Sequence, residues 1–230
     1  MGKICVIALK EVKEILKTRS TLILGIVFAG FFAFMYSQNV ANNGEGAIDG
    51  AVFFLSLSIA LFVAYTTTAQ VFLLEKREGV IETLMCAPVS LRQIWAGKTA
   101  AGLVPSWVIS LFAIVLLVIL SSVKADTLMI PDISVILHVL VTVPMFIAAF
   151  IGLVGFGQLL LGMKENRLLN FIVFMPAFAA LYGSGFAVAG GLRVTWPHVL
   201  IALGASLVLL GIAGFLTRFL SRERIVTTIE

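Results

Sequence analysis

Charge is what this sequence lacks most. Asp, Glu, Lys and Arg make up 12% of its 230 residues and hydrophobic residues 60%, whereas about 25% of a soluble domain is charged. About 20 apolar residues span the ~30 Å hydrocarbon core as a helix, and a charge at its centre costs about 3 kcal/mol or more. The sequence therefore predicts an all-α membrane protein with six transmembrane helices. The six charge-free stretches are Thr21–Ser37, Ala51–Leu74, Ala100–Ser122, Val135–Gly162, Leu168–Leu192 and His198–Thr217.

Other absences narrow the class of protein. The chain has two cysteines, Cys5 and Cys86, too far apart for a metal-binding pattern and both on the same predicted side, so we expect neither a metal site nor a disulfide. The first twenty residues lack the apolar core and cleavage site of a secretory signal. Six spans leave no room for a second folded domain, so we divide the chain into an interfacial helix (1–19), a transmembrane domain (20–222) with a cytoplasmic loop (75–99), and a tail (223–230).

Lysine and arginine are very unevenly distributed among the predicted loops. Of the 16 such residues, 14 fall in the N-terminal segment, in the loops after the second and fourth spans, and in the tail, and only Lys124 and Arg193 fall elsewhere. The positive-inside rule therefore places both termini in the cytoplasm. The net charge of +4 is then a basic membrane rim and gives no reason to expect nucleic acid as a partner.

The segment Lys3–Arg19 has the pattern of an amphipathic helix lying on the membrane surface. Apolar residues recur at helical spacing and form one stripe, opposite a stripe of charged residues. Such a helix would hold its lysines near anionic lipid headgroups, and a plain membrane anchor is the alternative interpretation. The apolar stripe is Cys5, Ala8, Leu9, Val12, Ile15 and Leu16, and the charged stripe is Lys3, Lys10, Lys13, Glu14 and Lys17.

Two spans contain residues that disturb a straight helix. The fourth is 28 residues long with Pro144 about one-third of the way in, so we expect a tilt or a kink there. The fifth holds Pro176 and several glycines. Its outer half could fold back as a short re-entrant hairpin where protein or water covers it, or the whole span could be one continuous kinked helix, and the sequence leaves both alternatives open.

The loop after the second span has the densest charge in the chain. Glu75 to Glu78 can extend the second helix into the cytoplasm, and Gly79 offers a bend. A short separate helix is predicted for 80–86, ending before Pro88 because proline disfavours helical geometry in the residue that precedes it. The predicted result is a compact helical projection continuous with two spans.

The third helix has a clear start signal well before its membrane entry at Ala100. Ser90 is followed three positions later by Gln93, the spacing of a capping box. This pair predicts that the helix begins at Leu91.

The order of residues in this loop resembles a known family. It reads Glu-x-x-Glu-Gly-x-x-Glu-x-Leu, then Pro-x-Ser, then Gly-Lys, similar to the loop between the second and third spans of type-2 ABC transporter permeases. Val80 departs from the pattern, since members often have threonine there. The interfacial helix and six spans with both ends inside extend the resemblance to nearly the whole chain. The matching residues are Glu75, Glu78, Gly79, Glu82, Leu84, Pro88, Ser90, Gly97 and Lys98.

The resemblance implies a permease subunit of an ATP-driven transporter in the cytoplasmic membrane of a prokaryote, with export as the expected direction. Two copies, or this chain and a close relative, would form the pathway in the lipid. A separate cytosolic subunit would bind ATP and Mg²⁺, so this chain would be no enzyme and hold no cofactor. That subunit would dock on loop 75–90 and on the interfacial helix. The implied coupling residues are Glu75, Lys76, Arg77, Glu78, Gly79, Glu82, Leu84 and Pro88, with Lys10, Lys13 and Lys17 on the interfacial helix.

One motif could suggest nucleotide binding by the chain itself. Gly97-Lys98-Thr99 matches the end of a P-loop, but that motif needs a glycine five positions earlier, where this sequence has Arg92, and a preceding strand. We therefore reject it. A non-ABC multi-span carrier or a membrane scaffold is the alternative function, although the spans lack the ionisable group that a secondary carrier usually needs.

Polar side chains inside the spans either bond neighbouring helices or face a transport pathway, and the sequence favours helix bonding. His138 and His198 are predicted to lie at the outer interface, and the three tryptophans in belts at both interfaces. The polar candidates are Tyr65, Thr66, Thr67, Thr68, Gln70 and Gln158.

Overall fold

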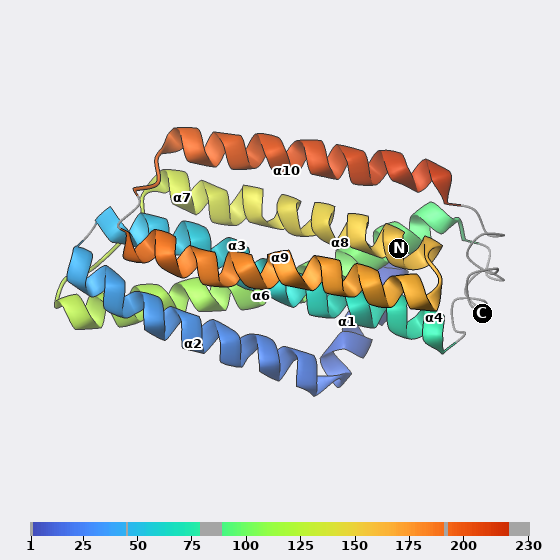
Figure 1. Ribbon diagram of the computed structural model, residues 1–230, viewed down its shortest axis with the longest axis horizontal. Helices are drawn as coiled ribbons and strands as arrows, with labels where there is room; N and C mark the ends of the chain where they lie inside the picture. The colour runs from blue at the N-terminus through green and yellow to red at the C-terminus, as the bar shows by residue number, and fades with distance from the viewer. Residues whose placement is uncertain (1, 45, 79–88, 191–192, 221–230) are drawn as a thin grey trace.

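The computed structural model describes residues 2–44, 46–78, 89–190 and 193–220, and all secondary structure in these ranges is helical (Figure 1). The elements are α1 (Lys3–Lys17), α2 (Arg19–Asn43), α3 (Gly46–Thr68), the π-helix η1 (Ala69–Leu74), α4 (Glu75–Arg77), α6 (Leu91–Ala125), α7 (Ile133–Leu137), the π-helix η2 (His138–Thr142), α8 (Val143–Leu160), α9 (Met163–Ala189), α10 (Trp196–Leu216) and the 3-10 helix η3 (Thr217–Phe219).

Five helical segments in the described ranges are long and apolar enough to cross a membrane, which supports a multi-pass membrane protein. Each of the five contains most of one predicted span. Most of the predicted fifth span lies in α9, which is not among the five, so a sixth span stays a prediction. The five segments are Arg19–Asn43, Gly46–Arg77, Leu91–Ala125, Ile133–Leu160 and Trp196–Phe219.

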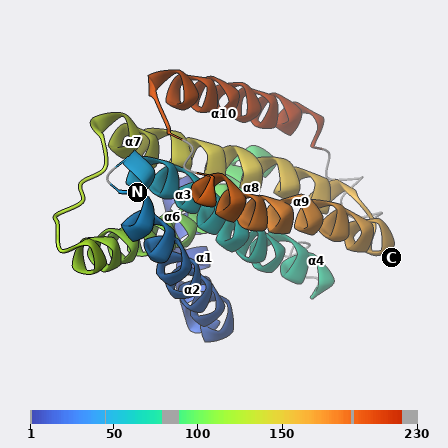
Figure 2. The same cartoon turned by 60° about the vertical axis from the view of Figure 1, so that its left-hand side comes forward.

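The helix α3 lies at the centre of the bundle and packs against α2, α6, α8 and α9. It is apolar on every face, which is the pattern of a helix buried on all sides. In the most apolar part of its span 78% of the residues are buried, compared with 17% for the segment containing α10, which packs on α8 at the edge of the bundle (Figures 1 and 2).

The short helix α1 runs across the long helices near one end of the bundle, which we call the α1 end (Figure 1). Figure 1 shows α4, the start of α9 and the last turn of α10 at this same end. The segments predicted to be cytoplasmic therefore gather together. Which side of a membrane the α1 end faces is still a prediction.

The predicted start of the third helix is confirmed. Ser90 is the N-cap of α6, which begins at Leu91. The Gln93 amide donates to Ser90 Oγ at 3.3 Å, and the Ser90 amide donates to Gln93 Oε1 at 3.1 Å. This capping box satisfies two backbone donors at the start of a 35-residue helix.

The fourth span is irregular, as predicted, directly before its proline. Pro144 lies in the first turn of α8, and the π-helix His138–Thr142 runs into α8 without a break. The missing N–H of Pro144 therefore leaves a carbonyl of the preceding turn without its helical donor. In the fifth span the structure has the continuous alternative. α9 runs unbroken from Met163 through Pro176 to Ala189, with no re-entrant hairpin in that range.

Three predictions about aromatic and histidine side chains need correction. His138 was predicted to lie at the outer interface. It is instead fully buried between helices, and its ring stacks on that of Phe53 with 4.1 Å between the ring centroids. The indoles of Trp95 and Trp107 are turned into the bundle, where they donate to the carbonyls of Gly152 (3.0 Å) and Val139 (3.1 Å). These two tryptophans thus join α6 to the fourth span.

Trp196 and His198, which were also predicted to lie at an interface, are at the start of α10. Trp196 is 47% exposed, as a belt residue would be. His198 is exposed, and its Nδ1 lies 2.9 Å from Thr195 Oγ1, so it caps the first turn of α10.

Candidate functional site

The helix α1 packs directly on α6 because residue 97 has no side chain. A Cβ atom at Gly97 would lie 2.7 Å from Ile7 Cγ2 and 3.2 Å from the Ile4 carbonyl oxygen. Such distances are below van der Waals contact, so only glycine lets the two helices approach this closely.

The side chains of α1 divide differently from the predicted stripes. The charged stripe is exposed as expected, but Ile15 is the one buried member of the apolar stripe, while Cys5, Leu9 and Leu16 are exposed. Glu11, only 2% exposed, is buried beside α6. The amphipathic, membrane-lying role of α1 stays a prediction, with its exposed apolar residues available for lipid.

Buried Glu11 belongs to a charge cluster that joins three elements. We define the charge cluster as Lys10, Glu11 and Glu14 of α1, Glu75 of α4 and Lys98 of α6. Lys98 Nζ is fully buried at its centre, 2.5 Å from Glu75 Oε2, 3.2 Å from Glu11 Oε1 and 2.8 Å from the Val71 carbonyl oxygen. Lys10 Nζ lies 3.6–3.7 Å from a carboxylate oxygen of each of the three glutamates.

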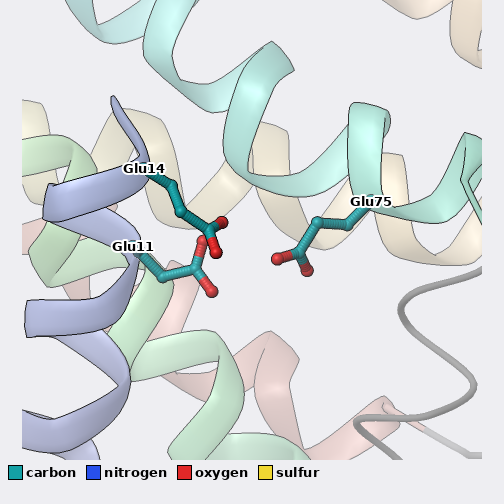
Figure 3. A group of neighbouring side chains, drawn as sticks. All are labelled: Glu11, Glu14 and Glu75. Atoms are coloured by element: carbon teal, nitrogen blue, oxygen red, sulfur yellow. The ribbon is translucent and has the colours of Figure 1, made fainter. Parts of the chain in front are cut away.

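The three carboxylates of the charge cluster point toward one another (Figure 3). One oxygen from each lies within 4.8 Å of the others, a separation that a divalent cation could bridge. Here Lys98 and Lys10 supply the positive charge between them, so the acidic group alone is no argument for a metal. Burial makes these ion pairs sensitive to the loss of either partner.

The protonation of α1 side chains responds to this environment. Burial raises the pKa of Glu11 above its usual value and Glu75 adds to the rise, although Lys98 and Lys10 act in the opposite direction. Burial alone would lower the pKa of Lys10, but Glu11, Glu75 and Glu14 outweigh it and leave that pKa raised. The cluster thus favours a charged Lys10 and resists full ionisation of Glu11.

A pocket of about 130 Å³ lies beside the charge cluster. The side-chain oxygen of Gln70, one of the polar candidates, lines it without a hydrogen-bond partner, and Glu78 lines its edge. Glu78 is the last described residue before 79–88, so the cluster lies next to the segment predicted to contact an ATP-binding subunit.

The predicted coupling residues fall into three groups. Glu75 and Lys76 are buried: Glu75 binds Lys98, and Lys76 Nζ donates to the carbonyls of Leu159 (3.0 Å) and Leu161 (2.6 Å) at the end of α8. Arg77 and Glu78 are exposed. The contact of these four residues with a partner stays a prediction. Burial gives Glu75 and Lys76 a positioning role within the chain. Gly79, Glu82, Leu84 and Pro88 lie outside the described residues.

Polar residues of the spans mostly serve helix packing. The hydroxyls of Thr66 and Thr67 bond carbonyls of their own helix, and Thr67 also lies 3.4 Å from Ser106 Oγ of α6. Tyr65 donates from α3 to the Asn170 carbonyl at 3.3 Å. These contacts favour the helix-bonding interpretation over a pathway.

Two asparagines that no sequence pattern singles out continue this network into α9. Gln158 of α8 donates to Asn170 Oδ1 at 3.0 Å. Asn166 is fully buried, and its amide donates to the carbonyls of Gln158 (3.0 Å) and Leu161 (2.9 Å). In the sequence, an asparagine near the charged start of a helix looks like an ordinary polar loop residue. Its role in packing is recognised only from its burial in the structure.

Gly97→Ala is expected to loosen α1 from α6, because the new methyl group would overlap Ile7. Overpacking of this kind costs about 1–3 kcal/mol, so trypsin should cleave after Lys17 several-fold faster than in the unmodified protein. Gly211→Ala is the matched control, since a Cβ there meets nothing within 4 Å. Equal cleavage rates in the two variants would contradict the tight contact of α1 with α6.

Comparison with protein-family models, curated proteins and solved structures found no match to this chain.

Proposed function

We propose that this chain is the transmembrane permease subunit of an ATP-driven ABC transporter, most simply an exporter, that works with a separate cytosolic ATP-binding subunit. In this proposal both termini face the cytoplasm and two permease copies form the pathway. The proposal rests on the loop residues that resemble type-2 ABC permeases, and it is supported by the geometry of the charge cluster beside that loop.

The charge cluster is the structural observation that supports the proposal. It fixes α1, α4 and α6 to one another through Glu11, Glu75 and Lys98, and Lys76 adds the end of α8. The segment 79–88 connects α4 to the chain leading into α6. A force applied to that segment would therefore move several helices as a unit, which is what coupling to a motor protein requires.

The proposal includes α9 as the sixth span. Its 27 residues correspond to about 40 Å of helix at about 1.5 Å per residue, and the sequence is free of charge from Leu168 to Ala189. α9 lies along α3 in the bundle (Figure 1) and exposes large apolar side chains over its length, including Phe171, Met175 and Phe186. An exposed apolar face of this length is suited to lipid.

Affinity purification of the full chain from its native membrane tests the proposal. We expect an ATP-binding subunit with a P-loop to co-purify, and ATP with Mg²⁺ to change the cross-linking of α1 to its surroundings. If no such subunit accompanies the protein and ATP has no effect on cross-linking, the chain is a carrier of another class or a scaffold.

A further inference from the structure

A second pocket at the α1 end is lined by cations from helices far apart in the sequence. It has a volume of about 260 Å³ and lies between the end of the second span and the start of α9. Arg77 comes from α4, and Lys164 and Arg167 come from the first two turns of α9. The remaining lining residues are Leu73 and Asn170.

No carboxylate of the described residues pairs with the positive charges of this pocket. In the described residues, Arg77, Lys164 and Arg167 are exposed and make no ion pair, unlike Lys10 and Lys98 of the charge cluster. Glu165, next to Lys164, has its carboxylate against Gly162, and Glu78, next to Arg77, lines the pocket beside the charge cluster. Neither glutamate lines this second pocket.

Two cations near the N-terminus of α9 interact unfavourably with the dipole of that helix. The N-terminus of a helix carries partial positive charge, so Lys164 and Arg167 do not stabilise α9 by their position. Three cations that converge without a carboxylate repel one another, and an anion bound among them would relieve this repulsion.

The same face of α9 continues into apolar side chains. Positions 164, 167, 171 and 175 lie on one face of a helix, and Phe171 and Met175 are each more than half exposed. Leu73 adds an apolar contact inside the pocket. The surface thus places a phosphate-sized cationic site directly beside an apolar strip.

We propose that this pocket binds the phosphate group of an anionic membrane phospholipid, with the acyl chains lying along Phe171 and Met175. Cationic pockets between transmembrane helices are suited to such headgroups. The apolar strip favours a lipid over free phosphate, because only an amphiphile satisfies both parts of the surface. The bound lipid would join α4 to α9. This site depends on the protein being in a membrane and does not require an ATP-binding subunit.

Native mass spectrometry of the purified chain with three ligands tests the site. The ligands are phosphatidylglycerol, phosphatidylcholine with the same acyl chains, and inorganic phosphate. We expect phosphatidylglycerol to bind most tightly. The triple variant Arg77→Gln, Lys164→Gln, Arg167→Gln should lower that affinity on the order of a hundredfold, because each cation near anionic lipid contributes a similar favourable energy.

The matched control removes the same charge from exposed positions outside the pocket, by Arg19→Gln, Arg92→Gln and Arg218→Gln. This control should change the affinity for phosphatidylglycerol less than about threefold. If the triple variant of the pocket does not fold, the single variant Lys164→Gln gives the same test, with an expected loss of affinity of about fivefold. An equal loss in the control would overturn the proposal in favour of general attraction. Tight binding of phosphate alone, or of phosphatidylcholine, would overturn the assignment to an anionic lipid.

Discussion

Lys98→Met is expected to destabilise the protein by about 3–5 kcal/mol, the usual effect of removing one partner from a buried ion pair. Lys98 is fully buried and is the closest cation to both Glu75 and Glu11. Without it, two buried carboxylates would face each other with only half-exposed Lys10 nearby. The midpoint of chemical unfolding in detergent measures the loss, with trypsin cleavage after Lys17 reporting whether α1 separates.

The cost of this substitution should depend on pH with a definite sign. Burial already holds the pKa of Glu11 above its usual value of 4.5, and loss of the Lys98 ammonium would raise it further. A carboxyl whose pKa is higher in the folded state than in the unfolded state stabilises the fold when it is protonated. This contribution is complete below the pKa of the unfolded state and is lost as the pH rises through the pKa of the folded state. The destabilisation by Lys98→Met should therefore be smaller near pH 4.5 than at pH 7.5.

Lys13→Met is the matched control, because Lys13 is exposed on α1 and takes no part in the charge cluster. It should change stability little. The additional changes Glu11→Gln and Glu75→Gln should restore part of the stability lost in Lys98→Met, since they remove the unpaired charge. If all these variants unfold at the same denaturant concentration, the charge cluster does not hold α1 to the bundle.

The features that could be predicted from sequence are those that depend on local chemistry. A long run of residues without charge predicts a membrane-spanning helix whatever its neighbours are, and the five helical segments that are long and apolar enough to cross a membrane match predicted spans. The capping box of Ser90 and Gln93 is equally local, because its hydrogen bonds involve residues three apart. For this reason even the first residue of α6 was predictable.

The burial of Glu11 could not be predicted in this way. On a helical projection Glu11 lies near a charged stripe, and it is buried because α1 crosses α6 at Gly97, a contact between segments about 90 residues apart in the chain. The loop residues Gly97 and Lys98 carried a signal, since both belong to the motif that resembles ABC permeases. Their structural reason, close approach for the glycine and charge balance for the lysine, appears only when the helices are assembled.

His138 shows the same limit in the membrane. The sequence places it near the end of an apolar span, where an interfacial position is the ordinary outcome. Its burial against Phe53 depends on how α3 packs beside η2, and hydropathy carries no information about which face of a span meets another helix.

Reversing two acidic residues of the loop, Glu78→Lys with Glu82→Lys, is expected to separate the ATP-binding subunit from this protein. Charge reversal at a complementary interface costs about 2 kcal/mol or more, so the affinity should fall by roughly thirtyfold. Glu78 is exposed and makes no ion pair with the described residues, so insertion and folding of the spans should be unaffected. Glu82 enters this prediction through the loop motif alone.

Quantitative co-purification measures the association, and the unfolding midpoint of the isolated variant establishes that the fold is intact. Glu165→Lys is the matched control for the single variant Glu78→Lys. Both glutamates are exposed at the α1 end, but Glu165 lies on α9 and outside the loop. Full retention of the ATP-binding subunit by the double variant would remove loop 75–90 from the coupling mechanism. If Glu165→Lys loses that subunit to the same extent as Glu78→Lys, the partner responds instead to net charge at this end of the bundle, because a docking contact confined to the loop would not be affected by a change on α9.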